Sequence, residues 1–382
     1  MKIVISMDSF KGSISSMEAG GVLKRAVLDS FPHDEVEVFP LADGGEGTVD
    51  AMTQGLGGQI VPVQVMGPLG EGVMSRYGYL PETGTAVIEM ADASGLTMVP
   101  KSRRNPLHTT TYGLGQLIIA AMEQGCRKFI VGIGGSATND CGLGMLTALG
   151  WRFLRQDGSE AGCYGRDLAD IASVDTSGVH GLLAECEFHI ACDVNNPLCG
   201  SNGCSHVYGP QKGATPEIVS RMDSDISRFA DIAERALSRH GKDMPGAGAA
   251  GGLGFAFHVF LGGVLTPGVN LILQSIGIEG ALREADVLIT GEGRMDRQTA
   301  MGKAPAGVAQ LAKRCNPDCC TVALCGCAAS DAHEVNGHGI DAYFPILHGP
   351  MTVEQAMELS VTRENLALTI QQVMNLLHRR DA

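Results

Sequence analysis

The amino-acid sequence predicts an α/β protein in which a doubly wound parallel-sheet domain is interrupted by a second, inserted α/β domain. Strand–loop–helix units open the chain, and the same rhythm returns after about residue 280. Short β-rich pieces and a glycine-dense stretch lie between these two regions and break the rhythm. We therefore expect residues 1–60 and 280–382 to form one domain and residues 61–279 to form the inserted one.

The first elements are the clearest. The β-branched run 3–5 predicts a strand, and alternation over 36–39 predicts a second one. Ser15 and Glu18 have the spacing of a capping box, which indicates a helix that runs to about Phe31. A strand, a loop and a helix repeated in this way are typical of a parallel sheet.

The later elements follow from apolar runs and capping signals. Further strands are predicted at 60–65, 86–90, 129–133, 285–290, 321–324 and 342–346. Helices are predicted at 114–124, at 215–240 and from a Thr352/Gln355 capping box onward. The glycine-dense stretch 243–254 is expected to be a loop.

Glycine is the unusual residue of the composition. It accounts for 52 of 382 residues, which is about twice its usual share of ~7%. The glycines follow no collagen-like period, so the excess indicates tight turns or places where a ligand approaches the backbone. Hydrophobic residues make up 44% of the chain and charged residues 18%, which excludes intrinsic disorder.

The net charge and the cysteines narrow the class of partner. The formal charge is −14, from 42 acidic and 28 basic residues, which argues against nucleic acid or an anionic membrane as a partner. The spacing of the 12 cysteines is irregular, so reduced thiols are favoured over a disulfide framework or a zinc site. No apolar run reaches ~18 residues. We expect a cytoplasmic protein with small-molecule substrates; whether it forms a homo-oligomer is left open.

Two glycine-rich loops at predicted strand ends carry acids and a lysine. Asp8 follows the first strand and Lys11 leads to the next helix, which suits binding of phosphate or carboxylate. After the second strand, Gly44 and Gly45 would let backbone N–H groups approach an anion. Asp43 beside them is a carboxylate suited to Mg²⁺.

The segment after the buried strand 129–133 has two interpretations. Read as G-x-G-x-x-A, residues 132–137 resemble a dinucleotide-binding fingerprint, with Asp157 as the ribose-binding acid. A nicotinamide-dependent oxidoreductase acting on a small hydroxy acid is therefore an alternative function. The same segment also carries side chains that would suit a polyhydroxylated or carboxylate substrate: Ser136, Thr138, Asn139 and Asp140.

The remaining polar loop residues favour phosphoryl transfer. Asp193 ends a predicted strand, and Lys212 lies between glycines in a loop suited to phosphate. The loop after residue 290 adds Arg294, Asp296, Gln298 and Lys303. Walker A and protein-kinase signatures are absent, and no His or Cys nucleophile stands out. Asp and Lys at glycine-rich strand ends suit a reaction that depends on positioning and charge neutralisation.

Taken in order, these motifs resemble the successive blocks of the bacterial glycerate kinase family, of the glycerate 2-kinase type. The blocks are Asp8-Ser9-Phe10-Lys11, Ala42-Asp43-Gly44-Gly45-Glu46-Gly47-Thr48, Gly134-Gly135-Ser136-Ala137-Thr138-Asn139-Asp140, Asp193 with Asn196-Pro197-Leu198, Gly209-Pro210-Gln211-Lys212-Gly213-Ala214, Ala249-Ala250-Gly251-Gly252 and Thr290-Gly291-Glu292-Gly293-Arg294. The resemblance runs from residue 3 to about 350. Ser6-Met7 departs from the family's usual Ala-Pro, and Cys141 stands where the family tends to have Gly.

The resemblance implies ATP-dependent phosphorylation of D-glycerate, with the 2-hydroxyl as the expected acceptor. It also implies a flavodoxin-like outer domain and an active site in the cleft between the two domains, with Mg²⁺ as cofactor. A non-catalytic sensor of small acids would share the same pocket without consuming ATP.

Roles for single residues follow as hypotheses from this resemblance. Asp193 or Asp8 would accept the proton of the substrate hydroxyl, and Asp43 or Asp296 would hold Mg²⁺. The glycerate carboxylate and the nucleotide phosphates would be neutralised by Lys11, Lys212 and Lys303. Gly44 and Gly45 would approach the nucleotide. The residues expected to bind glycerate are Ser136, Thr138, Asn139, Asp140, Arg294 and Gln298.

Overall fold

The structure, a computed structural model, describes residues 1–379, and the chain folds into two compact units. The first unit comprises Met1–Asp43, Asp50–Gly57 and the chain from Val269 on; the second comprises Gly44–Val49 and Gly58–Gly268. The boundary expected at 279/280 therefore lies at 268/269. It lies there because the last strand of the second unit's sheet ends at Thr266.

The first unit is built on a five-stranded parallel sheet with the order β13-β12-β11-β1-β2. Its strands are β1 (Lys2–Met7), β2 (Glu35–Val38), β11 (Val287–Met295), β12 (Cys320–Ala328) and β13 (Ala342–Pro345). Counted along the chain within this unit, the spatial order is 2-1-3-4-5, which is the flavodoxin-like order. The predicted doubly wound parallel sheet is confirmed.

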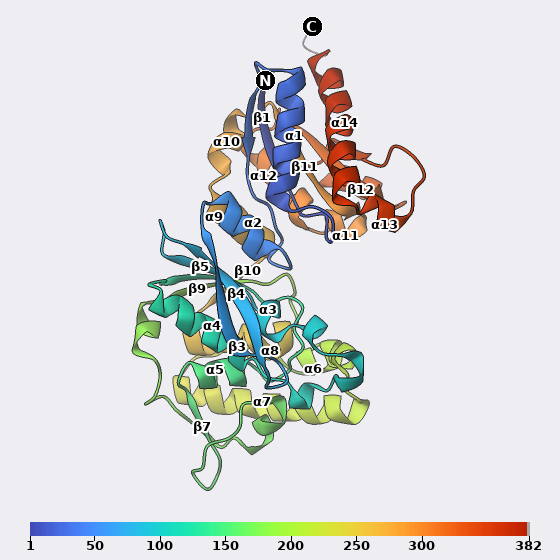
Figure 1. Ribbon diagram of the computed structural model, residues 1–382. Helices are drawn as coiled ribbons and strands as arrows, with labels where there is room; N and C mark the ends of the chain where they lie inside the picture. The colour runs from blue at the N-terminus through green and yellow to red at the C-terminus, as the bar shows by residue number, and fades with distance from the viewer. Residues whose placement is uncertain (380–382) are drawn as a thin grey trace. The chain divides into compact units, whose positions relative to one another are not determined.

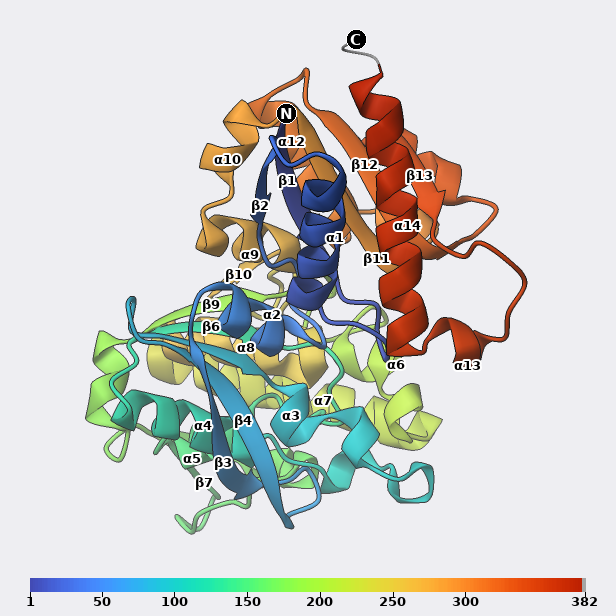
Figure 2. The same cartoon turned by 45° about the horizontal axis from the view of Figure 1, so that its top comes forward.

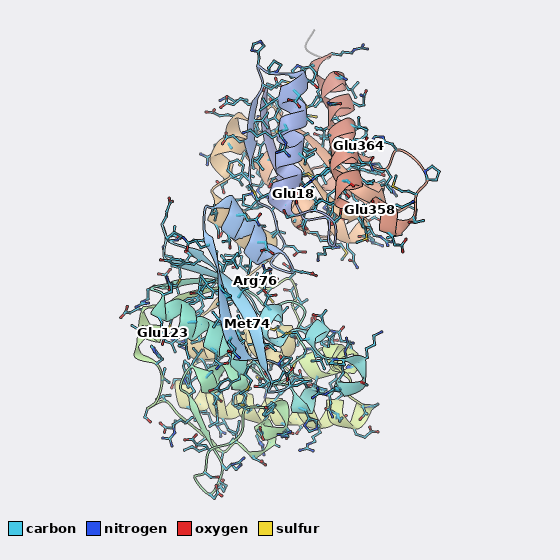
Figure 3. The ribbon with its side chains drawn as sticks, viewed as in Figure 1. Glu18, Met74, Arg76, Glu123, Glu358 and Glu364 are labelled. Carbon is cyan, nitrogen blue, oxygen red and sulfur yellow. The ribbon has the colours of Figure 1, made fainter. Side chains whose placement is uncertain are left out.

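Helices cover both faces of this sheet. They are α1 (Ser16–Ser30), α2 (Thr48–Gly55, from Asp50 on), α9 (Gly268–Ile276, from Val269 on), α10 (Glu279–Glu284), α11 (Arg297–Ala300), α12 (Ala304–Cys315), α13 (Val353–Ala356) and α14 (Leu359–His378). α1 and α14 lie side by side on one face in both views (Figures 1 and 2), and their apolar residues share one core with the sheet. Glu18 on α1 is ion-paired with Arg363, close to the labelled Glu364 of α14 (Figure 3).

The second unit is built on a six-stranded mixed sheet with the order β10-β9-β6-β5-β4-β3. Its strands are β3 (Gln59–Met66), β4 (Gly72–Leu80), β5 (Thr85–Glu89), β6 (Lys128–Gly132), β9 (Glu187–Ala191) and β10 (Val264–Thr266), and a separate hairpin pairs β7 (Arg152–Leu154) with β8 (Ser173–Asp175). The strands β5, β6, β9 and β10 run parallel, so their carboxyl ends share one edge. β4, which carries the labelled Met74 and Arg76 (Figure 3), runs antiparallel to both of its neighbours.

The helices of the second unit are α3 (Ala91–Ser94), α4 (Tyr112–Glu123), α5 (Leu143–Ala148), α6 (Cys204–Tyr208), α7 (Pro216–Leu237) and α8 (Ala249–Leu261). α7 begins at the predicted N-cap, where the Thr215 hydroxyl accepts from the Ile218 N–H at 3.4 Å. It ends at Leu237 because Ser238 has a left-handed φ of 52°, so the helix does not reach residue 240 as predicted. Within residues 1–379, no helix is long and apolar enough to span a membrane.

Three further elements differ from the sequence predictions. The expected loop 243–254 contains the start of α8, whose regular turns begin at Leu253 after three left-handed residues. β11 was expected to end near Thr290 but continues to Met295. The final helix is divided: Thr352 and Gln355 form the predicted capping box, but on the four-residue α13, and α14 follows from Leu359.

Candidate active site

A cavity of about 440 Å³ lies in the first unit at the carboxyl ends of β1 and β11. These two strands flank the point where the strand order reverses, which is where open α/β sheets bind their ligands. The charged side chains that line the cavity are Asp8, Lys11, Asp43, Glu292, Arg294 and Lys303. Five of these six residues are candidates from the sequence, and the fold brings them together.

Asp8 is held directly after β1. Its N–H donates to the Gly291 carbonyl at 2.9 Å, and its carboxylate accepts from the Ser9 N–H at 2.7 Å. The pKa of Asp8 is raised to about 7, mainly by burial and also by the nearby Asp43 and Glu292, whereas the Ser9 hydrogen bond and the charge of Lys11 oppose the change. A carboxyl group that titrates close to neutral pH is suited to accept and release a proton in catalysis.

Glu292 is the one charged residue of the cavity lining that the sequence analysis did not select as a site residue. It lies inside β11, is 7% exposed, and accepts a hydrogen bond from the Thr299 hydroxyl. Burial raises its pKa, and the charge of Lys303 opposes that change. The available signal was an acid between two glycines, but those glycines indicated a loop rather than a strand.

The glycines around Glu292 are needed for strand pairing. A Cβ on Gly291 would lie 1.8 Å from the Leu324 carbonyl oxygen, and one on Gly326 would lie 2.5 Å from the Gly293 oxygen. β11 and β12 can therefore stay paired to the edge of the cavity only with glycine at these positions. The close approach keeps Glu292 within a paired strand at the carboxyl end of the sheet.

The two metal candidates have different surroundings. Asp43 lines the cavity, whereas Asp296 caps α11, where its Oδ1 accepts from the Gln298 N–H at 2.9 Å and its Oδ2 lies 3.8 Å from Arg294. Gln298 is exposed and does not line the cavity. Residues 1–379 contain no group of three or more His, Cys, Asp or Glu side chains placed to hold a metal ion. One or two carboxylates completed by substrate phosphates is, however, the usual way in which Mg²⁺ is bound.

A cluster of polar side chains in the second unit surrounds the buried Lys212, and we call it the Lys212 group. This lysine ends a short turn, and its ammonium donates to the Ser136 hydroxyl at 2.7 Å and the Thr138 carbonyl at 2.6 Å. Burial lowers the pKa of Lys212 to about 8. An ammonium has three donors, and these bonds use two of them. Among residues 1–379, the Thr138 hydroxyl and the side-chain amide oxygen of Asn139 are buried without a hydrogen-bond partner. Such unsatisfied polar atoms beside a buried cation fit a site for a small anion.

Hydrogen bonds of Asp140 and Asn139 hold the loop of the Lys212 group in place. The Asp140 carboxylate accepts hydrogen bonds from the Thr111 N–H and hydroxyl and from the N–H groups of Gly142 and Gly144. The Asn139 amide nitrogen donates to the Ser205 hydroxyl at 2.9 Å. Asp140, which the sequence placed among the substrate-binding residues, is thus fully buried and bonded within the protein.

Strained backbone supports the same loop. Cys141 and Ala250 have φ values of 51° and 53°, in the left-handed region that favours glycine, so the family's usual Gly in place of Cys141 has a structural reason. The Cys141 N–H donates to the Gly251 carbonyl at 2.9 Å, and a Cβ on Gly251 would lie 2.2 Å from the Thr138 oxygen. The two strained segments therefore pack against each other next to the Thr138 carbonyl, which accepts a hydrogen bond from the Lys212 ammonium.

We expect Ala250→Gly to stabilise the protein by ~1 kcal/mol, because glycine adopts the left-handed conformation without steric cost. Urea unfolding monitored by circular dichroism measures the change. Ala247→Gly is the matched control: Ala247 is also buried but has no positive φ, so this variant should lose stability. A loss of stability in Ala250→Gly as well would show that the left-handed φ of Ala250 carries no strain.

The other sequence candidates, Asp193, Gly44 and Gly45, do not line the cavity. Asp193 follows β9, and its Oδ1 accepts from the Gly268 N–H at 2.8 Å. Gly44 has a φ of 86° and packs on Ala191, where a Cβ would lie 2.5 Å from the Ala191 Cβ. The Gly45 carbonyl accepts the Thr48 hydroxyl at 2.7 Å. Neither glycine lines the cavity that contains Lys303.

The dinucleotide interpretation lacks its structural context. No helix follows Gly132–Ala137 directly, because α5 begins only at Leu143. The expected ribose acid, Asp157, is exposed in a turn, where it accepts the Ser159 N–H at 2.9 Å. The geometry therefore does not favour a nicotinamide-dependent oxidoreductase.

Comparison with known proteins gives one family. The model of the glycerate kinase family matches residues 3–378. A glycerate kinase of Bacillus subtilis is 46% identical, over 94% of this chain and 93% of that protein, and a glycerate 2-kinase of Escherichia coli is 42% identical over 93% of each. A crystal structure described as a glycerate kinase 2 from Salmonella typhimurium LT2 is 42% identical, has a TM-score of 0.91, and aligns over 100% of this chain and 99% of that one. The chain belongs to the glycerate kinase family.

Proposed function

We propose that this protein phosphorylates D-glycerate at its 2-hydroxyl with ATP, giving 2-phosphoglycerate and ADP. The observation that carries the proposal is the similarity to glycerate kinases over nearly the whole chain, including the glycerate 2-kinase of Escherichia coli. The charged cavity and the Lys212 group support it, because phosphoryl transfer needs a proton acceptor, cations and positioned donors rather than a covalent nucleophile.

In this proposal Asp8 accepts the proton. The substrate hydroxyl oxygen attacks the γ-phosphorus, its proton passes to the Asp8 carboxylate, and the bond from the γ-phosphorus to the bridging oxygen breaks to release ADP. Asp8 is favoured over Asp193 because its pKa is raised to about 7, close to the working pH of a general base. Asp193 already holds the Gly268 N–H and is assigned a positioning role.

The basic side chains neutralise the substrate anions. We assign Lys11 and Lys303, which line the cavity, to the nucleotide phosphates. Lys212, Ser136 and Thr138 bind the glycerate carboxylate. The carboxylate oxygens accept from the third N–H of the Lys212 ammonium and from the buried Thr138 hydroxyl, which otherwise have no acceptor in the described part of the chain.

Mg²⁺ is the proposed cofactor, with Asp43 and Glu292 as the residues that would hold it, in place of Asp296, which caps α11. When bound, the ion would supply charge neutralisation at the phosphates. We propose further that the protein is cytoplasmic and acts on small molecules alone.

One coupled experiment tests the function. The protein is incubated with D-glycerate and MgATP, ADP release is followed, and the position of the phosphoryl group is read by phosphorus NMR. We expect ADP release that depends on D-glycerate, and 2-phosphoglycerate as the product. A 3-phosphoglycerate signal would reject the regiochemistry, and binding of glycerate without ADP release would identify a sensor of small acids.

A further inference from the structure

The cavity has an apolar wall that the roles proposed above leave unused. It is formed by residues that follow β13 together with one residue of the loop after β1, and we call it the apolar shelf: Phe10, Ile346, Leu347, Met351, Val353 and Met357. Val353 is 69% exposed and Met357 40% exposed. Apolar side chains that stay exposed while lining a cavity indicate a surface that a ligand covers.

The shelf is held in place by hydrogen bonds around its base. Thr352 and Gln355 form the capping box of α13, next to the labelled Glu358 at the start of α14 (Figure 3). The Thr362 hydroxyl donates to the Ala356 carbonyl at 3.1 Å and lies 2.6 Å from the Ser13 hydroxyl. These bonds engage the hydroxyl groups of Ser13, Thr352 and Thr362, and the side chains of the shelf itself present only carbon and sulfur atoms.

The loop after β1 contacts the shelf directly. Gly12 has a φ of 77°, and a Cβ at this position would lie 2.7 Å from the Met357 Cε. Met357 therefore rests on the same loop that carries Lys11. The cavity thus joins a charged region, in which Lys11, Arg294 and Lys303 accompany three carboxylates, to an apolar surface supported by the adjoining loop.

We propose that the apolar shelf binds the base of the nucleotide while the basic side chains bind its phosphates. This inference rests on the proposed use of ATP. The volume of about 440 Å³ lies within the range of ~300–1,000 Å³ typical of small-ligand pockets. A nucleoside triphosphate is the ligand whose chemistry matches both walls, since it joins three phosphates to a flat, weakly polar ring system.

The shelf should select for the shape of the base and not for its hydrogen-bonding edge. Strong discrimination between similar ligands requires polar groups of the site that the wrong ligand leaves unpaired. The hydroxyl groups at this end are already paired with each other and with the backbone. We therefore expect kcat/KM for GTP to lie within ~10-fold of that for ATP.

Binding measurements on the full chain test the shelf. The variant is Val353→Ser with Met357→Ser, and Leu376→Ser, on α14 and 60% exposed, is the matched control. Isothermal titration with MgADP and with magnesium tripolyphosphate separates binding of the base from binding of the phosphates. We expect the dissociation constant for MgADP to rise ~10-fold in the double variant, that for tripolyphosphate to be unchanged, and the control to bind both as the wild type does.

Unchanged MgADP binding in the double variant would overturn the proposal, as would an equal loss for tripolyphosphate. A preference for ATP over GTP above ~10²-fold would overturn the inferred tolerance of the shelf. If the double variant fails to fold, the single Val353→Ser, at the more exposed position, is used with the expectation of a smaller loss for MgADP alone. The titration needs no glycerate, so failure of glycerate turnover would reject the proposed function without affecting this test.

Discussion

Asp8→Asn is expected to lower kcat by ~10²-fold or more, because the amide cannot accept the proton of the substrate hydroxyl. In the wild type the carboxylate must be ionised, and the Asp8 pKa is raised to about 7. The kcat/KM of the free enzyme should therefore fall as the pH drops below about 7, and this acid limb should be absent from the variant. Initial rates measured across the pH range give both results.

Asp286→Asn is the matched control for this variant. Asp286 is also a carboxylate of the first unit, accepting the Lys2 N–H at 2.7 Å, but it does not line the cavity. Its replacement should leave the acid limb in place. A near-normal kcat in Asp8→Asn would remove Asp8 from the role of base and leave Asp193 as the candidate to test.

Asp8 also gives a stability change of predictable sign. Its pKa is about 7 in the folded protein and ~3.9 in an unfolded chain, so the folded state holds the proton more tightly. The contribution of Asp8 to stability is therefore complete below about pH 4 and is lost as the pH rises to about 7. At about pH 8 the Asn variant should be more stable than the wild type by on the order of 1–2 kcal/mol, as urea unfolding can measure.

Lys212→Met is expected to lower kcat/KM by ~10²-fold, because a buried charge-assisted contact to the substrate carboxylate is lost. Burial lowers the pKa of Lys212 to about 8, so the charged form is lost as the pH rises past that value. The wild-type kcat/KM should fall above about pH 8, and the variant should lack this alkaline limb. Bound glycerate would favour the charged lysine, so the limb in kcat should lie at higher pH.

Lys313→Met is the control for the lysine. The Lys313 ammonium contacts Asp341 at 2.7 Å, and neither residue lines the cavity or bonds to Lys212, so its loss should leave kcat/KM and the pH profile unchanged. An alkaline limb that persists in Lys212→Met would assign that limb to a different group. Thermal unfolding followed by circular dichroism verifies that both variants fold.

Cavity residues that directly follow a strand were easier to predict from the sequence than the cavity residue that lies inside a strand. Asp8 and Lys11 were found because a short β-branched run ends just before them, and the topology places that end at the switch point. Glu292 was missed because the glycines beside it usually mark a turn. Only the approach of β11 to β12 shows that these glycines permit pairing, and such a contact links positions about thirty residues apart.

Two other features could not be derived from local pattern. Asp140 looked like a ligand-binding residue because it ends a polar run, whereas its hydrogen bonds go to backbone and hydroxyl groups brought in by the fold. The members of the apolar shelf have no helical or strand periodicity, and only the course of the chain after β13 gathers them at one cavity. The class of reaction, in contrast, was predictable, because the motif blocks occur in the family's order.

The pairing of β1 with β11 has a consequence for how the chain acquires its structure during synthesis. Ile3 pairs with Val287, so the strand that precedes Asp8 emerges from the ribosome long before its central neighbour exists. The second unit is nearly continuous from Gly58 to Gly268 and can fold in the meantime, since domains generally fold as units. Until β11 has been synthesised, β1 has only β2 as a partner, and its apolar open edge is a site for aggregation. The arrangement that places Asp8 beside Glu292 is therefore completed late in translation.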